Sequence, residues 1–85
     1  MTIKRYMERN EILQKLNEIF RDVLDNEDIV LTEDSCADDI EEWDSLSHIQ
    51  LIVAIEKEFK IKFTSRETFS WKNVKDMIDN ISTKI

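Results

Sequence analysis

The sequence predicts an all-α fold, a small helical bundle of three principal helices plus one short helix, with a long acidic loop between the first two helices. Apolar residues recur at spacings of three and four in three separate stretches, and this spacing gives a helix one apolar face. Residues 59–63 alternate with a period of two, but the sequence offers them no second strand. Since 85 residues fit one domain, we expect a single domain over residues 1–85, with its core at about residues 10–81.

The first predicted helix begins near Asn10, although Ile3, Tyr6 and Met7 would extend its apolar stripe backwards. Residues 1–9 are otherwise expected to form an N-terminal extension, and residues 82–85 a fraying end. The stripe itself comprises Ile12, Leu13, Leu16, Ile19, Phe20, Val23 and Leu24.

Residues 25–44 carry ten acidic side chains and no basic one, and they lack a helical period. Loops of this length are uncommon in small domains and often functional. Without a turn glycine or regular ligand spacing, these acids favour at most loose binding of divalent cations, so no metal site is assigned. Isolated apolar residues are expected to pin the loop to the core, namely Ile29, Val30, Leu31, Ile40 and Trp43.

The second predicted helix spans about Ser45 to Lys57. Asp44 and Ser45 are residue types that cap helix N-termini, because their side-chain oxygens accept hydrogen bonds from free first-turn amides. Either residue is a candidate cap, and the Ser45 hydroxyl is expected at or near solvent.

This helix has more apolar residues than one core stripe needs. Its expected core line comprises Leu51, Ile55 and Phe59, with Leu46 and Ile52 beside it. Ile49 and Val53 are displaced from that line. A helix of this kind is either unusually buried or presents apolar surface to a partner.

The C-terminal part is predicted to hold an extended connector, a short helix and a final helix. Ile61 and Phe63 of the connector should point inward, and Thr64 and Ser65 favour a helix start before residues 66–69. The final helix is expected to be capped by Asn73, with Asp76 as the partner in a capping-box-like pair, and Trp71 should cover the core just before it. Its stripe is Val74, Met77, Ile78 and Ile81.

The composition excludes several classes of function. The chain has no glycine, which phosphate-binding loops, nucleophile elbows and EF-hand loops require. Cys36 is the single cysteine, so no internal disulfide forms and a zinc site lacks its usual ligands. The net charge of −7 argues against nucleic acid and favours partners with basic patches. No apolar run suits a membrane span or a signal peptide, so a soluble cytoplasmic protein is expected.

His48 lies three residues after Ser45, which raises the hypothesis of a Ser-His hydrolase. The sequence argues against it, because no strained elbow, oxyanion hole or third orienting group can be identified. His48 is instead expected to be a solvated residue on the exposed face of the helix.

The run Trp43-Asp44-Ser45-Leu46, the apolar segment after it and the ending Ile55-Glu-Lys-Glu-Phe-Lys-Ile61 together resemble the second helix of acyl carrier proteins. The resemblance extends from about residue 10 to residue 81 and implies an acyl-carrier-like bundle. It implies that Ser45 carries 4′-phosphopantetheine, derived from coenzyme A, and that Asp44 is recognised by a phosphopantetheinyl transferase. The implied partner-docking face comprises Leu46, Ile49, Gln50, Val53 and Glu56.

The resemblance further implies a carrier with no catalytic residue of its own. The thiol of the arm would hold acyl groups as thioesters, and the partners would be the transferase, an acyl-loading ligase or acyltransferase, and downstream biosynthetic enzymes. Ser47, His48 and Gln50 are uncharged where fatty-acid carriers often have acids. The run Trp43-Asp44-Ser45-Leu46 resembles that of carriers dedicated to special pathways. We therefore favour a specialised lipid, polyketide or surface-glycan pathway over housekeeping fatty acid biosynthesis, and expect a monomer.

Two alternatives stay open from the sequence. An aminoacyl or peptidyl carrier of the D-alanyl or nonribosomal type would share the fold and the serine. An unmodified acidic adaptor would bind a basic partner through its helices, with Ser45 acting only as a helix cap.

Overall fold

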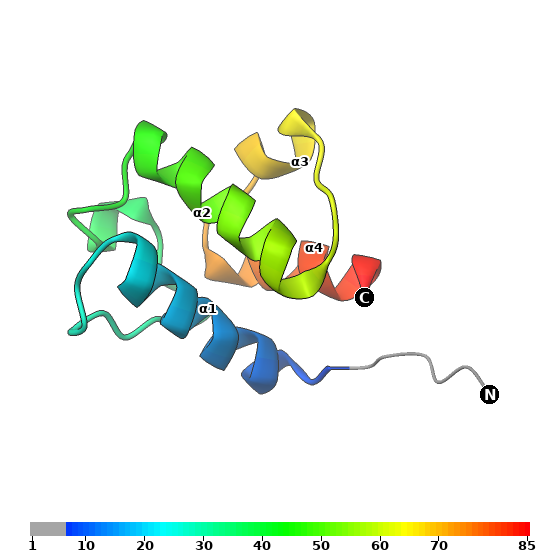
Figure 1. The fold of residues 1–85 in the computed structure, drawn as a ribbon, viewed down its shortest axis with the longest axis horizontal. Coiled ribbons are helices and arrows are strands. Elements are labelled where there is room, and N and C mark those ends of the chain that lie inside the picture. The colour runs from blue at the N-terminus through cyan, green and yellow to red at the C-terminus, as the bar shows by residue number, and fades with distance from the viewer. Residues whose placement is uncertain (1–6) are drawn as a thin grey trace.

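Three long helices and one short helix surround a common hydrophobic core in the computed structural model, which describes residues 7–85 (Figure 1). The helices are α1 (Arg9–Val23), α2 (Ser45–Phe59), α3 (Ser65–Phe69) and α4 (Val74–Lys84), and a 3₁₀ turn, η1, spans Ala37–Asp39. No strand occurs within residues 7–85. The predicted all-α bundle with one short helix is confirmed.

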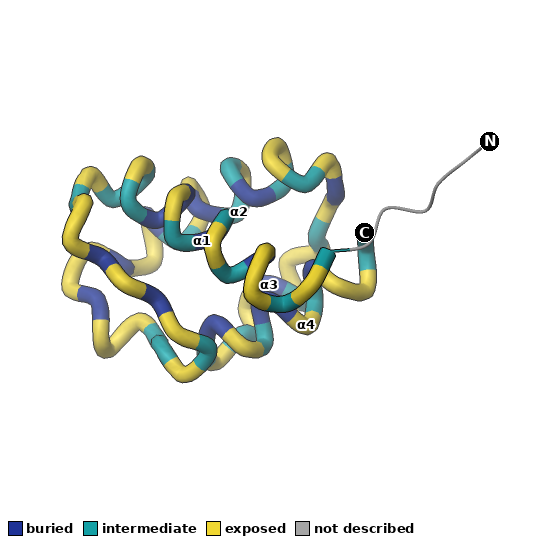
Figure 2. Tube along the Cα trace, turned by 90° about the horizontal axis from the view of Figure 1, so that it is seen from below, coloured by how far each residue is buried: buried dark blue, intermediate teal, exposed yellow. Residues whose placement is uncertain are grey.

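Helix α1 packs against both α2 and α4. It begins at Arg9, directly after Glu8, whose backbone N–H donates to Glu11 Oε1 at 3.0 Å. The predicted extension through Ile3 and Tyr6 lies outside the described residues. Figure 2 colours buried positions of the backbone tube dark blue, and some of them lie on α1. The buried residues of α1 are Ile12, Leu16, Ile19 and Phe20.

The loop between α1 and α2 alternates its side chains between core and solvent. Ile29 and Leu31 are buried, whereas Val30 between them is 73% exposed. The prediction that Val30 pins the loop is therefore wrong, because successive side chains of an extended segment point to opposite sides. Ile40 and Trp43 are buried as predicted.

Polar groups of the neighbouring helices hold this loop in place. From α1, Arg21 Nε donates to the Ile29 carbonyl at 2.7 Å, and Asn17 Oδ1 accepts from the Leu31 amide at 2.7 Å. At the start of α4, the Val74 and Lys75 amides donate to loop carbonyls at 2.8 Å each. These bonds satisfy several backbone groups of the loop outside its 3₁₀ turn.

Helix α2 buries a line of residues spaced by four. Leu51 and Ile55 are fully buried and Ser47 is 8% exposed. Leu46, expected beside this line, is 70% exposed. The expectation fails because Leu46 lies five residues before Leu51, about 140° around the helix.

Between residues 7 and 85, two residues take left-handed backbone conformations, although the chain has no glycine. Asp25 follows α1 with φ 51°, and Lys60 ends α2 with φ 56° and ψ 49°. The turn at Lys60 starts the connector to α3, in which Ile61 is buried and Phe63 half-buried, as predicted.

Side-chain caps start both C-terminal helices. Thr64 Oγ1 accepts from the Glu67 amide at 3.2 Å, and Asn73 Oδ1 accepts from the Asp76 amide at 3.0 Å. The Asp76 carboxylate accepts from the Lys72 amide at 3.0 Å, so it does not complete the predicted reciprocal pair with Asn73. Helix α4 buries the four predicted stripe residues and continues to Lys84.

Candidate functional site

The N-terminus of α2 is capped by a reciprocal pair of hydrogen bonds. Asp44 Oδ1 accepts from the Ser47 amide at 2.9 Å, and Ser47 Oγ accepts from the Asp44 amide at 2.8 Å. Ser47 Oγ also donates to the Glu42 carbonyl at 2.8 Å. Asp44 is therefore the helix cap, and the cap's serine is Ser47 rather than Ser45.

Ser45 is the first residue of α2 and is exposed to solvent. It takes no part in the cap, since the cap bonds join Asp44, Ser47 and the carbonyl before them. The expectation of a solvent-facing hydroxyl at a helix start agrees with this geometry.

The hydrogen bonds from Ser47, chiefly from its backbone amide, hold the pKa of Asp44 below its usual value. Hydrogen bonds to a carboxylate favour its charged form. The residue next to Ser45 is thus a fixed negative charge at neutral pH.

A hollow of about 310 Å³ opens beside Ser45. Ser45 itself lines it, together with side chains from the loop, α3 and the start of the α3–α4 connection. Phe69 on its rim is 76% exposed, although it is the last residue of a helix. The remaining lining residues are Ala37, Trp43, Asp44, His48, Trp71 and Lys72.

His48 is half-buried, which corrects the prediction of a solvated side chain. Its Nδ1 accepts from Trp43 Nε1 at 3.0 Å, and its Nε2 lies 3.2 Å from the Thr68 carbonyl oxygen. The rings of His48 and Trp43 are nearly parallel, with centroids 6.1 Å apart, and His48 forms a T-shaped pair with Trp71, with centroids 5.8 Å apart. Sequence spacing did not indicate these contacts, because two of the three partners are 20 or more residues away.

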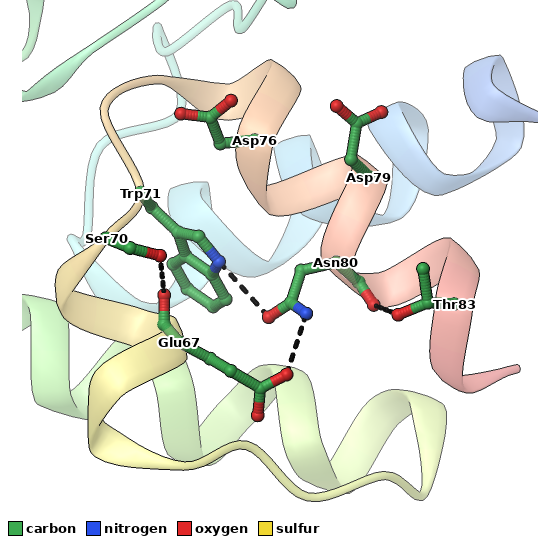
Figure 3. A pocket seen from close by; sticks show the side chains of 7 residues that line it. All are labelled: Glu67, Ser70, Trp71, Asp76, Asp79, Asn80 and Thr83. Atoms are coloured by element: carbon green, nitrogen blue, oxygen red, sulfur yellow. Dashed lines mark hydrogen bonds between the residues drawn. The ribbon is translucent and has the colours of Figure 1, made fainter.

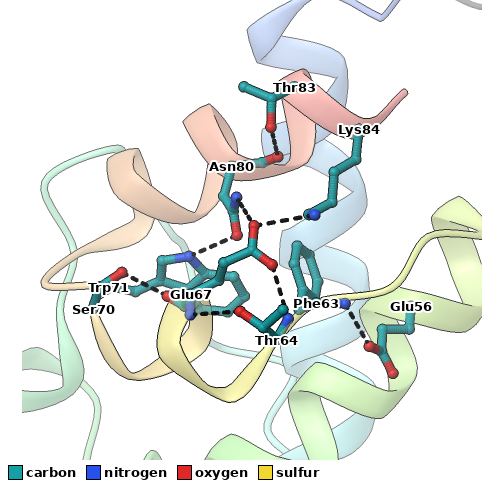
Figure 4. A network of polar contacts seen from close by, with 9 residues as sticks. All are labelled: Glu56, Phe63, Thr64, Glu67, Ser70, Trp71, Asn80, Thr83 and Lys84. Atoms are coloured by element: carbon teal, nitrogen blue, oxygen red, sulfur yellow. Dashed lines mark hydrogen bonds and ion pairs between the residues drawn. The ribbon is translucent and has the colours of Figure 1, made fainter.

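Helix α3 is fastened to α4 by a polar network around Glu67 (Figure 4). Glu67 Oε2 accepts from Asn80 Nδ2 at 2.9 Å and lies 3.1 Å from Lys84 Nζ. Asn80 Oδ1 in turn accepts from Trp71 Nε1 at 3.2 Å. The bond from Asn80, with those from the Thr64 amide and Lys84, lowers the pKa of Glu67 from 4.5 to about 2.

A second hollow, of about 420 Å³, lies between α3 and α4 (Figure 3). Three carboxylates line it, but Glu67 is held by Asn80 and Lys84, and Asp79 pairs with Arg9. Residues 7–85 contain no cluster of histidine, cysteine or acidic side chains that could hold a metal ion. This hollow is therefore part of the α3–α4 packing.

An apolar face of α2 lies next to Ser45 on the solvent side. Leu46 is 70% exposed, Ile49 54% and Val53 46%, with the exposed Gln50 among them. Glu56, the fifth predicted docking residue, is half-buried, and its carboxylate accepts from the Phe63 amide at 2.9 Å (Figure 4).

Three comparisons place the chain among known proteins. Residues 14–81 match the family described as "Phosphopantetheine attachment site". The chain is 36% identical over 80 residues to an acyl carrier protein of Thermosynechococcus vestitus, covering 93% of this chain and 98% of that protein. It is 30% identical over 79 residues to an acyl carrier protein of Coprothermobacter proteolyticus, covering 93% and 96%.

A solved structure agrees with these sequences. The solution NMR structure of holo acyl carrier protein from Geobacter metallireducens superposes with a TM-score of 0.79 at 49% identity, covering 85% of this chain and 83% of that one. The fold and the attachment-site family define a class of small helical carriers with a covalent 4′-phosphopantetheine group. The chain belongs to the acyl carrier protein family, whose members carry acyl groups and are not catalysts.

No helix in the described part of the chain combines the length and the apolar character needed to cross a membrane.

Proposed function

We propose that Ser45 is the attachment residue of this carrier. The observation that carries the proposal is that, within one helical turn, the residues that form the cap are not the residue that is exposed. Asp44 and Ser47 commit their side chains to the cap, while Ser45 leaves its hydroxyl exposed between them. A serine presented in this way can be reached by another enzyme without any loss of helix capping.

The residues around Ser45 fit a phosphodiester and the arm that extends from it. Ser45 begins a fifteen-residue helix, whose N-terminus carries partial positive charge. Lys72 lines the hollow beside Ser45 and supplies a cation. When attached, the group supplies a terminal thiol that holds acyl intermediates as thioesters.

Asp44 has two opposed effects in this proposal. Its ionised carboxylate repels a phosphodiester on the next residue, yet it offers a fixed charge for recognition by a phosphopantetheinyl transferase. We assign Asp44 to that recognition. Its low pKa keeps the charge in place across the neutral range.

This chain supplies no base for the attachment reaction. Both ring nitrogens of His48 are engaged, one by Trp43 and the other by the Thr68 carbonyl. The transferase, using coenzyme A and Mg²⁺, therefore provides the base and the metal. The chain acts as the substrate of that reaction and afterwards as a carrier.

Enzymes that load and consume the carried group are proposed to dock on Leu46, Ile49, Gln50 and Val53. These four residues share one solvent-facing side of α2 that begins at Ser45. The acidic segment, residues 25–44, ends directly before Ser45, so its negative charge would steer partners with basic patches toward this side of α2. Glu56 is left outside this face because its carboxylate holds the connector to α3.

The pathway is proposed to be a specialised one, making a lipid, a polyketide or a surface glycan. The support is chemical: the proposed face is apolar and amide-bearing, with no acidic side chain among its four members. An aminoacyl or peptidyl carrier is the alternative cargo class. Loading of the modified chain with fatty acids or amino acids by candidate ligases separates the two.

Intact-protein mass spectrometry tests the attachment residue. The chain is incubated with coenzyme A, Mg²⁺ and a broad-specificity phosphopantetheinyl transferase, with Ser45→Ala and Ser47→Ala alongside. We expect one phosphopantetheinyl group on the wild type and on Ser47→Ala, and none on Ser45→Ala. Modification of Ser45→Ala would contradict the assignment.

A further inference from the structure

His48 connects the loop before Ser45 to helix α3, and residues of both line the hollow beside Ser45. Trp43 Nε1 meets its Nδ1 at 3.0 Å, and its Nε2 meets the Thr68 carbonyl oxygen at 3.2 Å. An indole N–H can only donate and a carbonyl oxygen can only accept. His48 Nδ1 must therefore carry the lone pair and Nε2 the hydrogen, which is one specific neutral tautomer.

We propose that His48, in the neutral Nε2–H tautomer, is a positioning residue for the modification of Ser45. It holds Trp43 through one ring nitrogen and α3 through the other, and both contribute to the wall of the hollow, so that the surface around the serine keeps one shape. The inference rests on the proposed role of Ser45 and adds a residue that acts on it from the next helical turn.

Helix α3 needs such a contact because it has only five residues, too few to be stable by itself. Its network around Glu67 fastens it to α4. Among residues 7–85, the bond from His48 to the Thr68 carbonyl is the hydrogen bond that joins α2 to α3. Phe69, which follows Thr68, lines the same hollow as Ser45. Loss of the His48 bond would therefore remove the hydrogen bond that fixes α3 relative to α2 at the hollow, while the Glu67 network would still hold α3 on α4.

Trp43 is held at the other nitrogen of the His48 ring. Trp43 is 8% exposed, and its ring forms a T-shaped pair with Phe20, with centroids 4.9 Å apart and an interplanar angle of 86°. Its indole N–H points to His48, and its backbone leads directly into the cap residue Asp44. A rotation of this ring would disturb the turn that presents Ser45.

NMR of the unmodified, ¹⁵N-labelled chain tests the tautomer. We expect the His48 ring to show a protonated Nε2 and an unprotonated Nδ1 near pH 8, with the Trp43 indole proton protected from solvent exchange. A protonated Nδ1, or an indole proton that exchanges as fast as that of a free peptide, would overturn the inference.

Amide exchange then separates positioning from general stability. His48→Ala should raise exchange in α3 about tenfold while α1 changes less than twofold. His48→Gln should restore part of the α3 protection, because a Gln amide can still donate toward the Thr68 carbonyl. Lys57→Ala, an exposed change on α2, is the control. An equal rise in α1 and α3 would overturn the inference.

Transferase kinetics connect the contact to function. We expect His48→Ala to raise the transferase's KM for the chain roughly fivefold to tenfold with kcat within about twofold, and Trp43→Phe to give a smaller rise. Unchanged KM values with normal modification of the wild type would overturn this inference alone. A wild-type chain that is never modified would overturn the proposed function as well, so the two failures are distinguishable.

Discussion

Asp44 and Ser47 exchange two hydrogen bonds across the first turn of α2, at 2.8 and 2.9 Å. Ser45 lies between them in the chain and is exposed. One turn of helix therefore contains a serine that caps the helix and another that is exposed and takes no part in the cap.

The two serines should separate stability from modification. Ser47→Ala removes a buried hydroxyl that accepts one bond and donates another, and we expect a loss of about 1–2 kcal/mol in the free energy of unfolding. Ser45→Ala should change it by less than about 0.5 kcal/mol. Urea denaturation of both variants measures these values. A Ser45→Ala variant as unstable as Ser47→Ala would support the adaptor hypothesis, in which Ser45 is only a structural residue.

Asp44→Asn tests the charge without removing the cap, because asparagine caps helices as well as aspartate does. We expect a melting temperature close to the wild type and a clear drop in kcat/KM for the transferase. The measurement is the modification rate at several salt concentrations, since a charge contact weakens as salt rises. Equal rates for the variant and the wild type would remove Asp44 from transferase recognition.

Leu46 and Leu51 form a matched pair on one helix, since they carry the same side chain in opposite environments. Leu51→Ala should destabilise the chain by about 2–5 kcal/mol because Leu51 is fully buried. Leu46→Ala should leave stability within about 0.5 kcal/mol and lower kcat/KM for a loading enzyme roughly fivefold or more. An unchanged kcat/KM would place the docking face elsewhere.

Glu67 should make stability depend on acid pH. Its pKa is lowered from 4.5 to about 2 by Asn80, the Thr64 amide and Lys84. The stabilisation is therefore fully present above about pH 4.5 and is lost as pH falls toward 2. Melting temperatures measured between pH 6 and pH 2 should fall less steeply in Glu67→Gln than in the wild type.

Glu27→Gln is the control for this titration, because Glu27 lies exposed on the loop and is not part of the α3–α4 network. It should follow the wild-type curve more closely than Glu67→Gln does. Parallel curves for Glu67→Gln and the wild type would show that the network contributes nothing to acid stability.

Lys60 offers a stabilising substitution. It holds a left-handed conformation at the end of α2, which a side chain with a Cβ adopts only at a cost. Lys60→Gly should raise the free energy of unfolding by about 0.5–1 kcal/mol. This value is the net effect, because the greater conformational entropy of glycine in the unfolded chain opposes the gain. Lys62→Gly in the exposed connector should lower it instead. Chemical denaturation of both variants measures the difference.

The sequence alone was sufficient for the helices and for the family. Their apolar residues follow the helical repeat, and their caps are local, so neighbouring residues decide both. The motif around Ser45 predicted the acyl carrier family, and the comparisons confirm it. Its role as the attachment residue stays a prediction, as does the docking face.

Tertiary packing decided the features that depend on partners far along the chain. His48 is half-buried rather than solvated because it contacts the Thr68 carbonyl and the Trp71 ring. Phe69 stands beside Ser45 because the Glu67 network fixes α3 against α4. Local pattern carries no signal for either contact, since each depends on how separate helices meet. The sequence by itself determined which segments are helical and which family they form, whereas only the packing of α3 determined what surrounds the serine.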